Sequence, residues 1–555
     1  MREHRGPARG PLRRTVAAAG LVGLLLTTAA CGDDAGQSGA APGADDISEQ
    51  GDPVAGGSIE VGLEAETNSW LPGEGSFSNP GLNVAYSLYD PLMKRTADGD
   101  LEPYLAESME PNENFTTWTL TLRPDVLFHD GTPLDAQALK TIWDQYLTTP
   151  TSNLAASLAE VTSLDVVDEL TVRYNLAEPN AAFPDVLTGA AGWPFSPTAA
   201  AQFGPDAGAN PVGTGPFRFV SWQRDSALEL EANEDYWQED LPYLDGITFR
   251  PIPDEDTRLA SLQSGDIDAM QSLRQSTIAR ARDVEGVDNY EYLGNNSGGS
   301  LINTTRPPFD DPRVRQALAY AVNQEALIEV LGGTGLTPEA TQYFSPDSPF
   351  YSEDAAEAFP GFDGERATQL YEEYIDDPQR SDGQPVGAPI SFTYACPPDP
   401  SLNELSQLYQ SFWNRIGMDV ELTTVEQAAH IQNALAKNYD VQCFRFSSER
   451  DPYYVLSDAF TPGPLNFTGY TSPVIDEQLE VLRTTTDLDE RKDAVETISA
   501  DISEFVPNVF TGYTLTDLAV QDEVKNVDGW EFPDGTPGDG VPGATAMWGH
   551  VWTTG

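Results

Sequence analysis

The stretch that decides the fold runs from residue 390 to residue 446 and alternates strand patterns with helix patterns. It reads ISFTYA (390–395), NELSQLYQSFWNRI (403–416), DVELT (419–423), VEQAAHIQNALAK (425–437) and DVQCFRF (440–446). Apolar residues in the first helical segment recur at helical spacing: Leu405, Leu408, Phe412 and Ile416. Because parallel strands need crossovers of this kind, the pattern predicts a βαβαβ unit with a parallel sheet, and hence an α/β fold.

Two of the three cysteines, Cys396 and Cys443, fall on predicted strands of this unit. In the commonest winding the first strand lies between the other two, so both thiols would stand on adjacent strands. A disulfide and a pair of buried thiols both remain open at this point. The cysteines alone cannot build a metal site, and we expect neither a metal nor a cofactor.

The remaining chain carries shorter signals of mixed strands and helices. Alternating strands are predicted at 58–63, 118–123, 217–222, 228–231, 247–251 and 508–514, and helices at 135–146, 255–263, 365–375, 475–484 and 488–504. Gly265 is placed to end one of these helices, and Asp311 with Pro312 to begin another. His129 and Asp130 stand in a predicted tight turn, so we interpret them as structural rather than catalytic.

The composition is strongly acidic, with 88 Asp and Glu against 30 Lys and Arg and a formal net charge of −58. Such a field repels nucleic acid and anionic surfaces, so we expect no nucleic-acid partner. Adaptation to a saline habitat and selection for a cationic ligand both explain the acidity, and the sequence does not decide between them. Common hydrolase motifs such as Ser-x-x-Lys and Gly-x-Ser-x-Gly do not occur, and we assign no catalytic residue.

The N-terminus has the parts of a signal peptide over residues 1–30: an arginine-rich start, an apolar run and a tail of small residues. The segment Thr28-Ala-Ala-Cys31 resembles a bacterial lipobox, in which the thiol is acylated, although Thr28 departs from the usual leucine. Residues 31–56 are rich in Gly, Ala, Asp and Ser, which predicts a flexible tether. We therefore expect an exported lipoprotein, anchored to the outer face of the cell membrane through Cys31.

Eight phrases spread over the chain carry a family resemblance. They are LEPYLAE (101–107), WTLTLRPDVLFHDGTP (118–133), GTGPF (213–217), NEDYW (233–237), RLASLQSGDID (258–268), PFDDPRVRQAL (308–318), DP (451–452) and NFTGY (466–470). In this order they resemble the bacterial extracellular solute-binding proteins of family 5, the receptors of peptide and nickel importers.

The resemblance implies a two-lobed fold of the periplasmic-binding-protein type II kind, with a hinge between the lobes and ligand enclosed when they close. Lobe I would comprise residues 57–85, 198–300 and 510–555, and lobe II residues 301–509. A family-specific subdomain of lobe I would span residues 86–197.

The resemblance also implies a ligand cleft lined by three segments of the chain, residues 68–70, 296–299 and 446–454. The ligand-binding residues expected there are Asn68, Trp70, Ser297, Gly298, Phe446, Ser448, Glu449, Asp451, Tyr454 and Asn466. Trp70 is expected outside the core, as an aromatic wall. In the peptide receptors of this family an Asp four residues before the Pro of the Asp-Pro pair receives the peptide ammonium; here Ser448 holds that place and Glu449 follows it.

The expected function is that of a periplasmic or extracytoplasmic solute-binding protein and not of an enzyme. Its partners would be a small molecule or peptide and the permease subunits of an ABC transporter, and the protein would be a monomer. Because Ser448 replaces the carboxylate, sugars, opines and metal chelates stand beside peptides as ligands. A lipid-anchored hydrolase, and an adhesion or chaperone protein on the same fold, are the alternatives.

Overall fold

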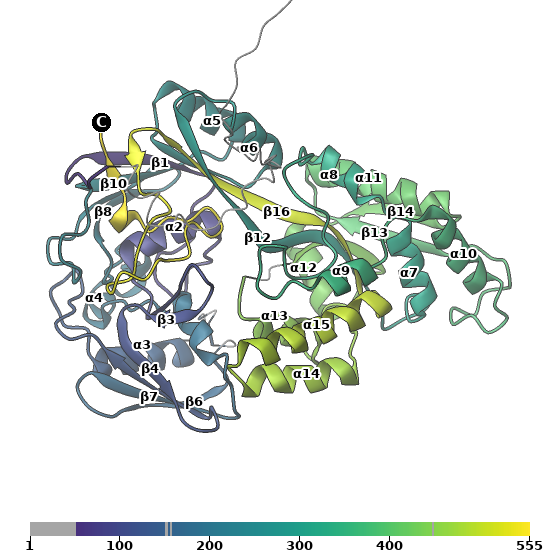
Figure 1. The fold of residues 1–555 in the computed structure, drawn as a ribbon, viewed down its shortest axis with the longest axis horizontal. Helices are drawn as coiled ribbons and strands as arrows, with labels where there is room; N and C mark the ends of the chain where they lie inside the picture. Colours follow the sequence, from purple (N-terminus) through teal and green to yellow (C-terminus); the bar gives the residue numbers. More distant parts are fainter. Residues whose placement is uncertain (1–50, 150–151, 153, 156–157, 447–448) are drawn as a thin grey trace, which may run out of the picture. The chain divides into compact units, whose positions relative to one another are not determined.

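The computed structural model describes residues 51–555 except 150–151, 153, 156–157 and 447–448 (Figure 1). The predicted signal peptide, most of the predicted tether including Cys31, and Ser448 therefore lie outside the described residues. Within the described ranges, no helix combines the length and the apolar character that crossing a membrane requires.

A ten-stranded sheet with the order β14-β13-β15-β12-β16-β11-β1-β10-β9-β8 organises the chain. Its strands are β1 (Ser58–Leu63), β8 (Phe217–Gln223), β9 (Ala227–Ala232), β10 (Gly246–Pro251), β11 (Ala269–Ser272), β12 (Val287–Ile302), β13 (Ser391–Cys396), β14 (Asp419–Thr424), β15 (Val441–Phe446) and β16 (Asn508–Gln521). The long strands β12 and β16 pair antiparallel, as Figure 1 shows. This pair joins the strands β13–β15 to the strands β1 and β8–β11.

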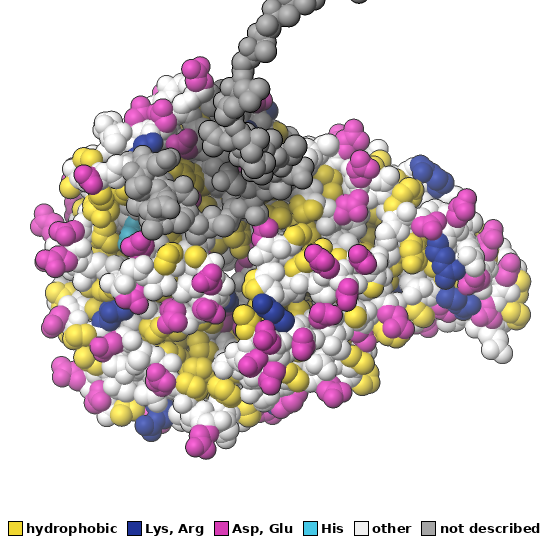
Figure 2. All heavy atoms as spheres, in the orientation of Figure 1, with side chains coloured by type: hydrophobic (Ala, Val, Ile, Leu, Met, Phe, Trp, Pro, Cys, Tyr) yellow, Lys and Arg dark blue, Asp and Glu magenta, His cyan; other side chains and the backbone are white. Residues whose placement is uncertain are grey.

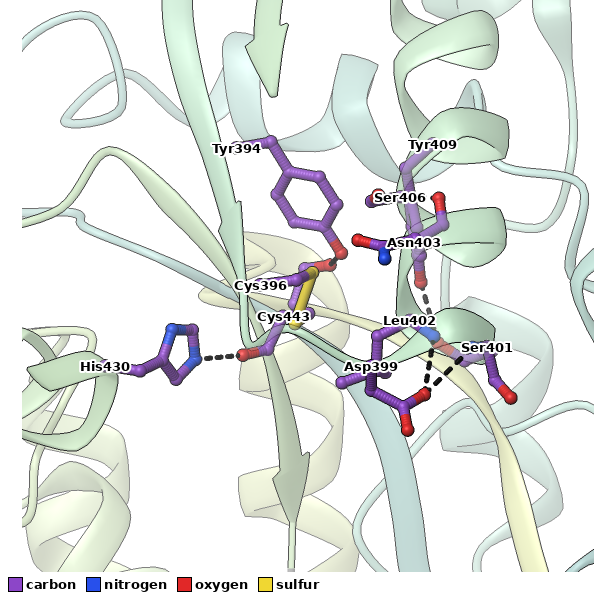
Figure 3. Close-up of a disulfide and its surroundings, with 12 residues drawn as sticks. Tyr394, Cys396, Asp399, Ser401, Leu402, Asn403, Ser406, Tyr409, His430 and Cys443 are labelled. Carbon is purple, nitrogen blue, oxygen red and sulfur yellow. Dashed lines mark hydrogen bonds between the residues drawn. A yellow bond between two sulfur atoms is a disulfide. The ribbon is translucent and has the colours of Figure 1, made fainter. Parts of the chain in front are cut away.

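The βαβαβ unit predicted at residues 390–446 is present: β13, α11 (Pro400–Arg415), β14, α12 (Gln427–Ala436) and β15. β13 pairs parallel with both β14 and β15, so the first strand lies between the other two, as predicted. A disulfide joins Cys396 to Cys443, whose Cα atoms are 5.3 Å apart (Figure 3). Beside it, Nε2 of His430 lies 2.8 Å from the carbonyl oxygen of Cys443. The structure thus has the disulfide and not two free thiols.

The chain before β12 supplies the other strands of the large sheet and a second sheet. β1 is parallel to β10 and β11, whereas β8 and β9 extend the sheet antiparallel. A four-stranded sheet has the order β4-β5-β7-β6, with β4 (Ala106–Pro111), β5 (Thr117–Leu122), β6 (Val161–Val166) and β7 (Thr171–Leu176). The short strands are β2 (Met93–Arg95), β3 (Leu101–Pro103), β17 (Val524–Lys525) and β18 (Trp552–Thr553).

Side-chain caps begin several helices. Asp135 caps α3 (Ala136–Thr148), Asp311 caps α7 (Pro312–Tyr320) and Asn323 caps α8 (Gln324–Val330) by accepting backbone N–H groups. Gly265 ends α5 (Glu255–Ser264) with a φ of 72°, a left-handed conformation that suits glycine. The other helices are α2 (Asn79–Leu88), α4 (Pro197–Phe203), α6 (Gln275–Ala281), α9 (Glu353–Ala358), α10 (Gly364–Ile375), α13 (Pro452–Phe460), α14 (Pro473–Thr484) and α15 (Leu488–Phe505), with 3-10 turns η1 (Phe183–Thr188), η2 (Ala190–Gly192), η3 (Gly204–Ala209) and η4 (Trp548–His550).

Separate apolar cores lie on the two sides of the β12–β16 pair. One core packs β1, β5, β10, α2 and α3 with buried residues of the C-terminal segment. A second packs β13–β15 against α7, α10 and α11, and a third surrounds α13, α14 and α15. Each side of the pair therefore buries its own apolar surface, which is the dominant favourable term in folding.

His129 has the structural role that its turn predicts. Gly213 donates its backbone N–H to Nδ1 of His129 at 3.2 Å, and Nε2 lies 3.0 Å from the carbonyl oxygen of Gly215. This pattern requires a neutral ring with its proton on Nε2, and burial lowers the pKa of His129 to about 4. The two glycines let this turn pass close to the end of α2, because a Cβ on Gly213 would stand 2.0 Å from the carbonyl oxygen of Leu88.

Candidate functional site

The loop after β15 and the first turn of α13 form the centre of the candidate site. Glu449 contacts strand β12, Asp451 contacts helix α15, and Arg450 and Tyr454 contact residues of the segment 86–197. Four neighbouring side chains thus reach three parts of the chain that are far apart in sequence. This convergence makes the loop a junction of three parts of the chain.

Glu449 is bound by donors of β12. Its carboxylate accepts hydrogen bonds from the Tyr292 hydroxyl at 3.0 Å, from the Asn295 backbone N–H at 2.8 Å and from Nδ2 of Asn296 at 3.1 Å. Gly294 allows this contact, because a Cβ there would lie 2.3 Å from Oε1 of Glu449. Burial raises the pKa of Glu449, while the hydrogen bonds from Tyr292 and Asn295 act to lower it. The carboxylate anchors the loop to β12.

Asp451 also forms its hydrogen bonds with other groups of the protein. It begins α13 by accepting the backbone N–H of Tyr453 at 2.9 Å. Both carboxylate oxygens accept hydrogen bonds from Nη2 of Arg491 in α15, each at 2.7 Å. Burial raises the pKa of Asp451, and the Arg491 guanidinium acts to lower it. Asp451 therefore holds the loop and α15 together.

Tyr454 connects α13 to the segment 86–197. Its hydroxyl donates to Oε1 of Glu160 at 2.6 Å and accepts from Nδ2 of Asn180 at 2.9 Å. The guanidinium of Arg450 lies over its ring, 4.4 Å from the centroid. Tyr454 is buried, so its hydroxyl needs these polar partners.

Arg450 approaches a buried carboxylate of the same segment. Nε of Arg450 lies 4.0 Å from Oδ2 of Asp185 in η1, and Nη2 of Arg95 from β2 binds Oδ1 of that residue. Asp185 is 4% exposed, whereas the Arg450 side chain remains 47% exposed. Two guanidinium groups therefore converge on one carboxylate at the site.

Ser297, Gly298 and Phe446 lie on the paired strands beside this loop. Ser297 is the register partner of Phe446, and Gly298 that of Arg445. Phe446 is buried with its ring 5.6 Å from that of Phe510. Ser297 is fully buried, and its hydroxyl has no hydrogen-bond partner among the described residues. The structure therefore places these three predicted residues next to the loop.

Three predicted ligand-binding residues form their contacts away from this loop: Asn68, Trp70 and Asn466. Asn68 closes its own loop, since its Oδ1 accepts the backbone N–H of Ser76 at 2.9 Å. Asn466 closes a turn through Nδ2, which donates to the Tyr470 carbonyl at 2.7 Å. Trp70 is 1% exposed and packs against Trp222, so the expectation that it lies outside the core is wrong. Apolar neighbours far away in sequence, which its polar local context does not reveal, bury its ring.

Sequence reasoning missed the residues that surround the loop: Arg95, Glu160, Asp185, Tyr292 and Arg450. Arg450 lies inside the predicted segment 446–454 and carries a signal, because basic residues are few beside acidic ones in this chain, 30 Lys and Arg against 88 Asp and Glu. The other four lie between about 160 and 360 residues before it, as the sequence numbering shows, so only the fold brings them to the loop.

Comparison with known proteins assigns the chain to a family. Residues 100–466, more than half of the sequence, match the bacterial extracellular solute-binding proteins, family 5 Middle. The chain belongs to this family. Among family 5 relatives, the glutathione-binding protein GsiB of Pectobacterium atrosepticum is 31% identical over 441 residues, which cover 75% of this chain and 82% of that protein. GsiB of Salmonella typhimurium is 28% identical over 478 residues, which cover 81% and 88%.

Solved structures confirm the predicted fold. The binding protein AgaA of A. tumefaciens R10, in complex with agropinic acid, has a TM-score of 0.74 at 24% identity and covers 90% of this chain and 99% of its own. DppA of Helicobacter pylori, in complex with the peptide STSA, has a TM-score of 0.73 at 20% identity and covers 92% and 99%. The fold is that of the type II periplasmic binding proteins of family 5.

The family 5 protein is therefore a solute-binding protein of an ABC importer family, as the sequence predicts. Its relatives and structural neighbours are binding proteins and not enzymes, so the hydrolase alternative is wrong. Members of this family are extracytoplasmic or periplasmic, and they bind small ligands or peptides and deliver them to ABC transporter permeases.

Proposed function

We propose that this family 5 protein is a lipid-anchored, monomeric receptor that captures one small solute between two lobes and delivers it to an ABC importer. Lobe I comprises residues 57–85, 198–300 and 510–555, with the subdomain 86–197, and lobe II residues 301–509. One observation carries the proposal: the segment 449–454, which ends in the first turn of α13, binds β12 through Glu449 and the subdomain through Tyr454. A ligand at this loop would meet groups from both lobes and from the strand that joins them.

The proposed ligand is a small, amino-acid-derived solute. The two GsiB relatives are named for glutathione, and structural neighbours hold agropinic acid, a peptide and a nickel–histidine complex. Ser448 stands where a peptide receptor of this family carries an ammonium-binding Asp. The neighbouring Glu449 is already hydrogen-bonded to β12. Ordinary α-linked peptides, whose ammonium would meet Ser448 instead of a carboxylate, are therefore weaker candidates than opine-like solutes or glutathione, whose γ-linked glutamate places its ammonium differently.

A thermal-shift panel tests the proposal. The soluble chain without its first 31 residues is mixed with glutathione, tripeptides, opines, sugars and nickel–histidine, each over a range of concentrations. A true ligand at one hundred times its Kd should stabilise the protein by about 2.7 kcal/mol and raise the melting temperature. A shift with glutathione or an opine supports the proposal. A panel in which no solute of any class shifts the melting temperature contradicts it.

The anchor is tested separately at Cys31. The wild-type chain, expressed in a bacterium with its leader, should be acylated and recovered with the membranes, because two or more buried acyl chains hold a protein there. Cys31→Ser should release the protein into the extracytoplasmic soluble fraction. The double variant Cys396→Ser with Cys443→Ser, which removes the disulfide of the folded domain, is the control and should remain membrane-bound. Recovery of Cys31→Ser with the membranes would contradict the lipid anchor.

A further inference from the structure

Two guanidinium groups and one carboxylate meet at the proposed site. Arg95 and Arg450 approach opposite oxygens of Asp185, and the Arg450–Asp185 contact is long, at 4.0 Å. Asp185 is 4% exposed, so it is a fixed, buried partner for both cations. The half-exposed Arg450 lacks a close bidentate partner in this contact, although its planar group is suited to one.

The other carboxylates near Arg450 do not complete its coordination. Glu449 accepts hydrogen bonds from Tyr292, Asn295 and Asn296, and Asp451 is paired with Arg491. Asp458 reaches Nη1 of Arg450 at 3.4 Å, but its side chain is 44% exposed, and solvent weakens such a contact. The guanidinium of Arg450 therefore retains capacity for a further anionic partner.

Tyr454 orients the guanidinium group of Arg450. Its ring lies under the Arg450 guanidinium at 4.4 Å, which covers one face of the planar group. The ring is itself fixed, because its hydroxyl binds Glu160 and Asn180. Stacking on a fixed ring leaves the N–H groups at the edge of the guanidinium to bind a carboxylate in its plane.

The charge of the whole protein makes such local cations necessary for an anionic ligand. The formal net charge is −58, and Figure 2 shows acidic side chains spread over the visible face with few basic ones. This field repels anions at long range. An anionic solute is therefore retained only where a guanidinium can bind it directly, and Arg450 is such a group.

We propose that the site binds a carboxylate-bearing, anionic solute, with Arg450 as the principal carboxylate-binding residue and Arg95 as the second cation. The inference rests on the proposed function and adds the charge class of the ligand. Asp185 holds the two cations in place and competes with the ligand for them. The ligand carboxylate takes the open position at the edge of the Arg450 guanidinium.

The test compares acids with derivatives in which the carboxylates are esterified or amidated, by calorimetric titration of the soluble chain. The probes are glutathione and its diethyl ester, Ala-Ala-Ala and its C-terminal amide, and citrate and its trimethyl ester. At least one acid should bind about tenfold or more tightly than its esterified or amidated derivative. Arg450→Gln should remove that preference, whereas Arg366→Gln should keep it; Arg366 is 40% exposed and has a comparably long contact, 4.0 Å, with Glu373.

The Asp185→Asn variant distinguishes two roles of Arg450. Arg450 either binds the ligand or only links the segment 449–454 to the segment 86–197. Since Asp185 competes for the cations, its neutral isostere should strengthen acid binding by about threefold or more. If the Arg450–Asp185 contact only holds the two segments together, Asp185→Asn and Arg450→Gln will weaken binding alike, and the inference is wrong. Equal binding of the acids and their esterified or amidated derivatives also overturns it.

The two proposals fail in different ways. If neutral or cationic solutes bind with a defined 1:1 stoichiometry and acids do not, the solute-binding function stands and the carboxylate inference falls. If no solute of any charge binds the chain, the proposed function fails, and this inference fails with it. Melting temperatures of Arg450→Gln and Asp185→Asn within a few degrees of the wild type confirm that both variants are folded.

Discussion

Replacing Arg491 by methionine is expected to lower the free energy of unfolding by about 3–5 kcal/mol, because it leaves a buried carboxylate without its counter-ion. Asp451 is 9% exposed and accepts two hydrogen bonds from Nη2 of Arg491, each at 2.7 Å. Arg491 also donates to the Leu482 carbonyl at 2.7 Å, so the substitution frees a second acceptor. Urea denaturation followed by circular dichroism measures the loss.

Lys492→Met is the matched control, since Lys492 is the next residue of α15 and is partly exposed. This substitution should change the free energy of unfolding by no more than about 0.5 kcal/mol. The double variant Asp451→Asn with Arg491→Met should recover part of the loss, because the uncompensated charge is gone and an Asn still caps α13. A loss below about 1 kcal/mol for Arg491→Met would show that the pair does not hold the loop to α15.

Removal of the disulfide is the second large effect. Cys396 and Cys443 are 47 residues apart in the sequence. A cross-link that closes a loop of this length restricts the unfolded chain enough to stabilise the fold by about 4 kcal/mol. The double variant Cys396→Ser with Cys443→Ser should therefore unfold at a lower urea concentration by this difference in free energy.

A reductant provides the internal control. Wild-type protein unfolded in dithiothreitol should lose stability to the level of the double serine variant, and the variant should not respond to the reductant. Both sulfurs are buried, so full reduction requires unfolding, and the comparison is made on samples equilibrated in urea. Equal stability of oxidised and reduced wild type would contradict a stabilising bridge.

The fold was predictable wherever the signal was local. The βαβαβ unit repeats short periodic segments, and helix starts such as Asp311 carry their own caps. Strand β12 was not predicted, because its sequence Gly294-Asn-Asn-Ser-Gly-Gly299 is poor in strand formers. It is a strand because β15 and β16 pair with it on either side, and such long-range pairing overrides local preference.

The candidate site was predictable only in part. The segment 446–454 was identified, and the structure places Glu449, Asp451 and Tyr454 at the centre of the contacts. Their partners could not be named, because Glu160 and Arg491 come from other elements that only the folded chain brings to the loop. Trp70 was misjudged for the same reason.

Native mass spectrometry of the soluble chain tests the central claim most directly. The protein is incubated with an unfractionated bacterial metabolite extract, desalted and sprayed without denaturation, in parallel with Arg450→Glu. We predict that a fraction of the wild-type chain retains one solute per chain, that the released solute carries a carboxylate, and that Arg450→Glu retains none. A wild-type chain that retains no solute, or an Arg450→Glu chain that retains the same solute to the same extent, would contradict the account.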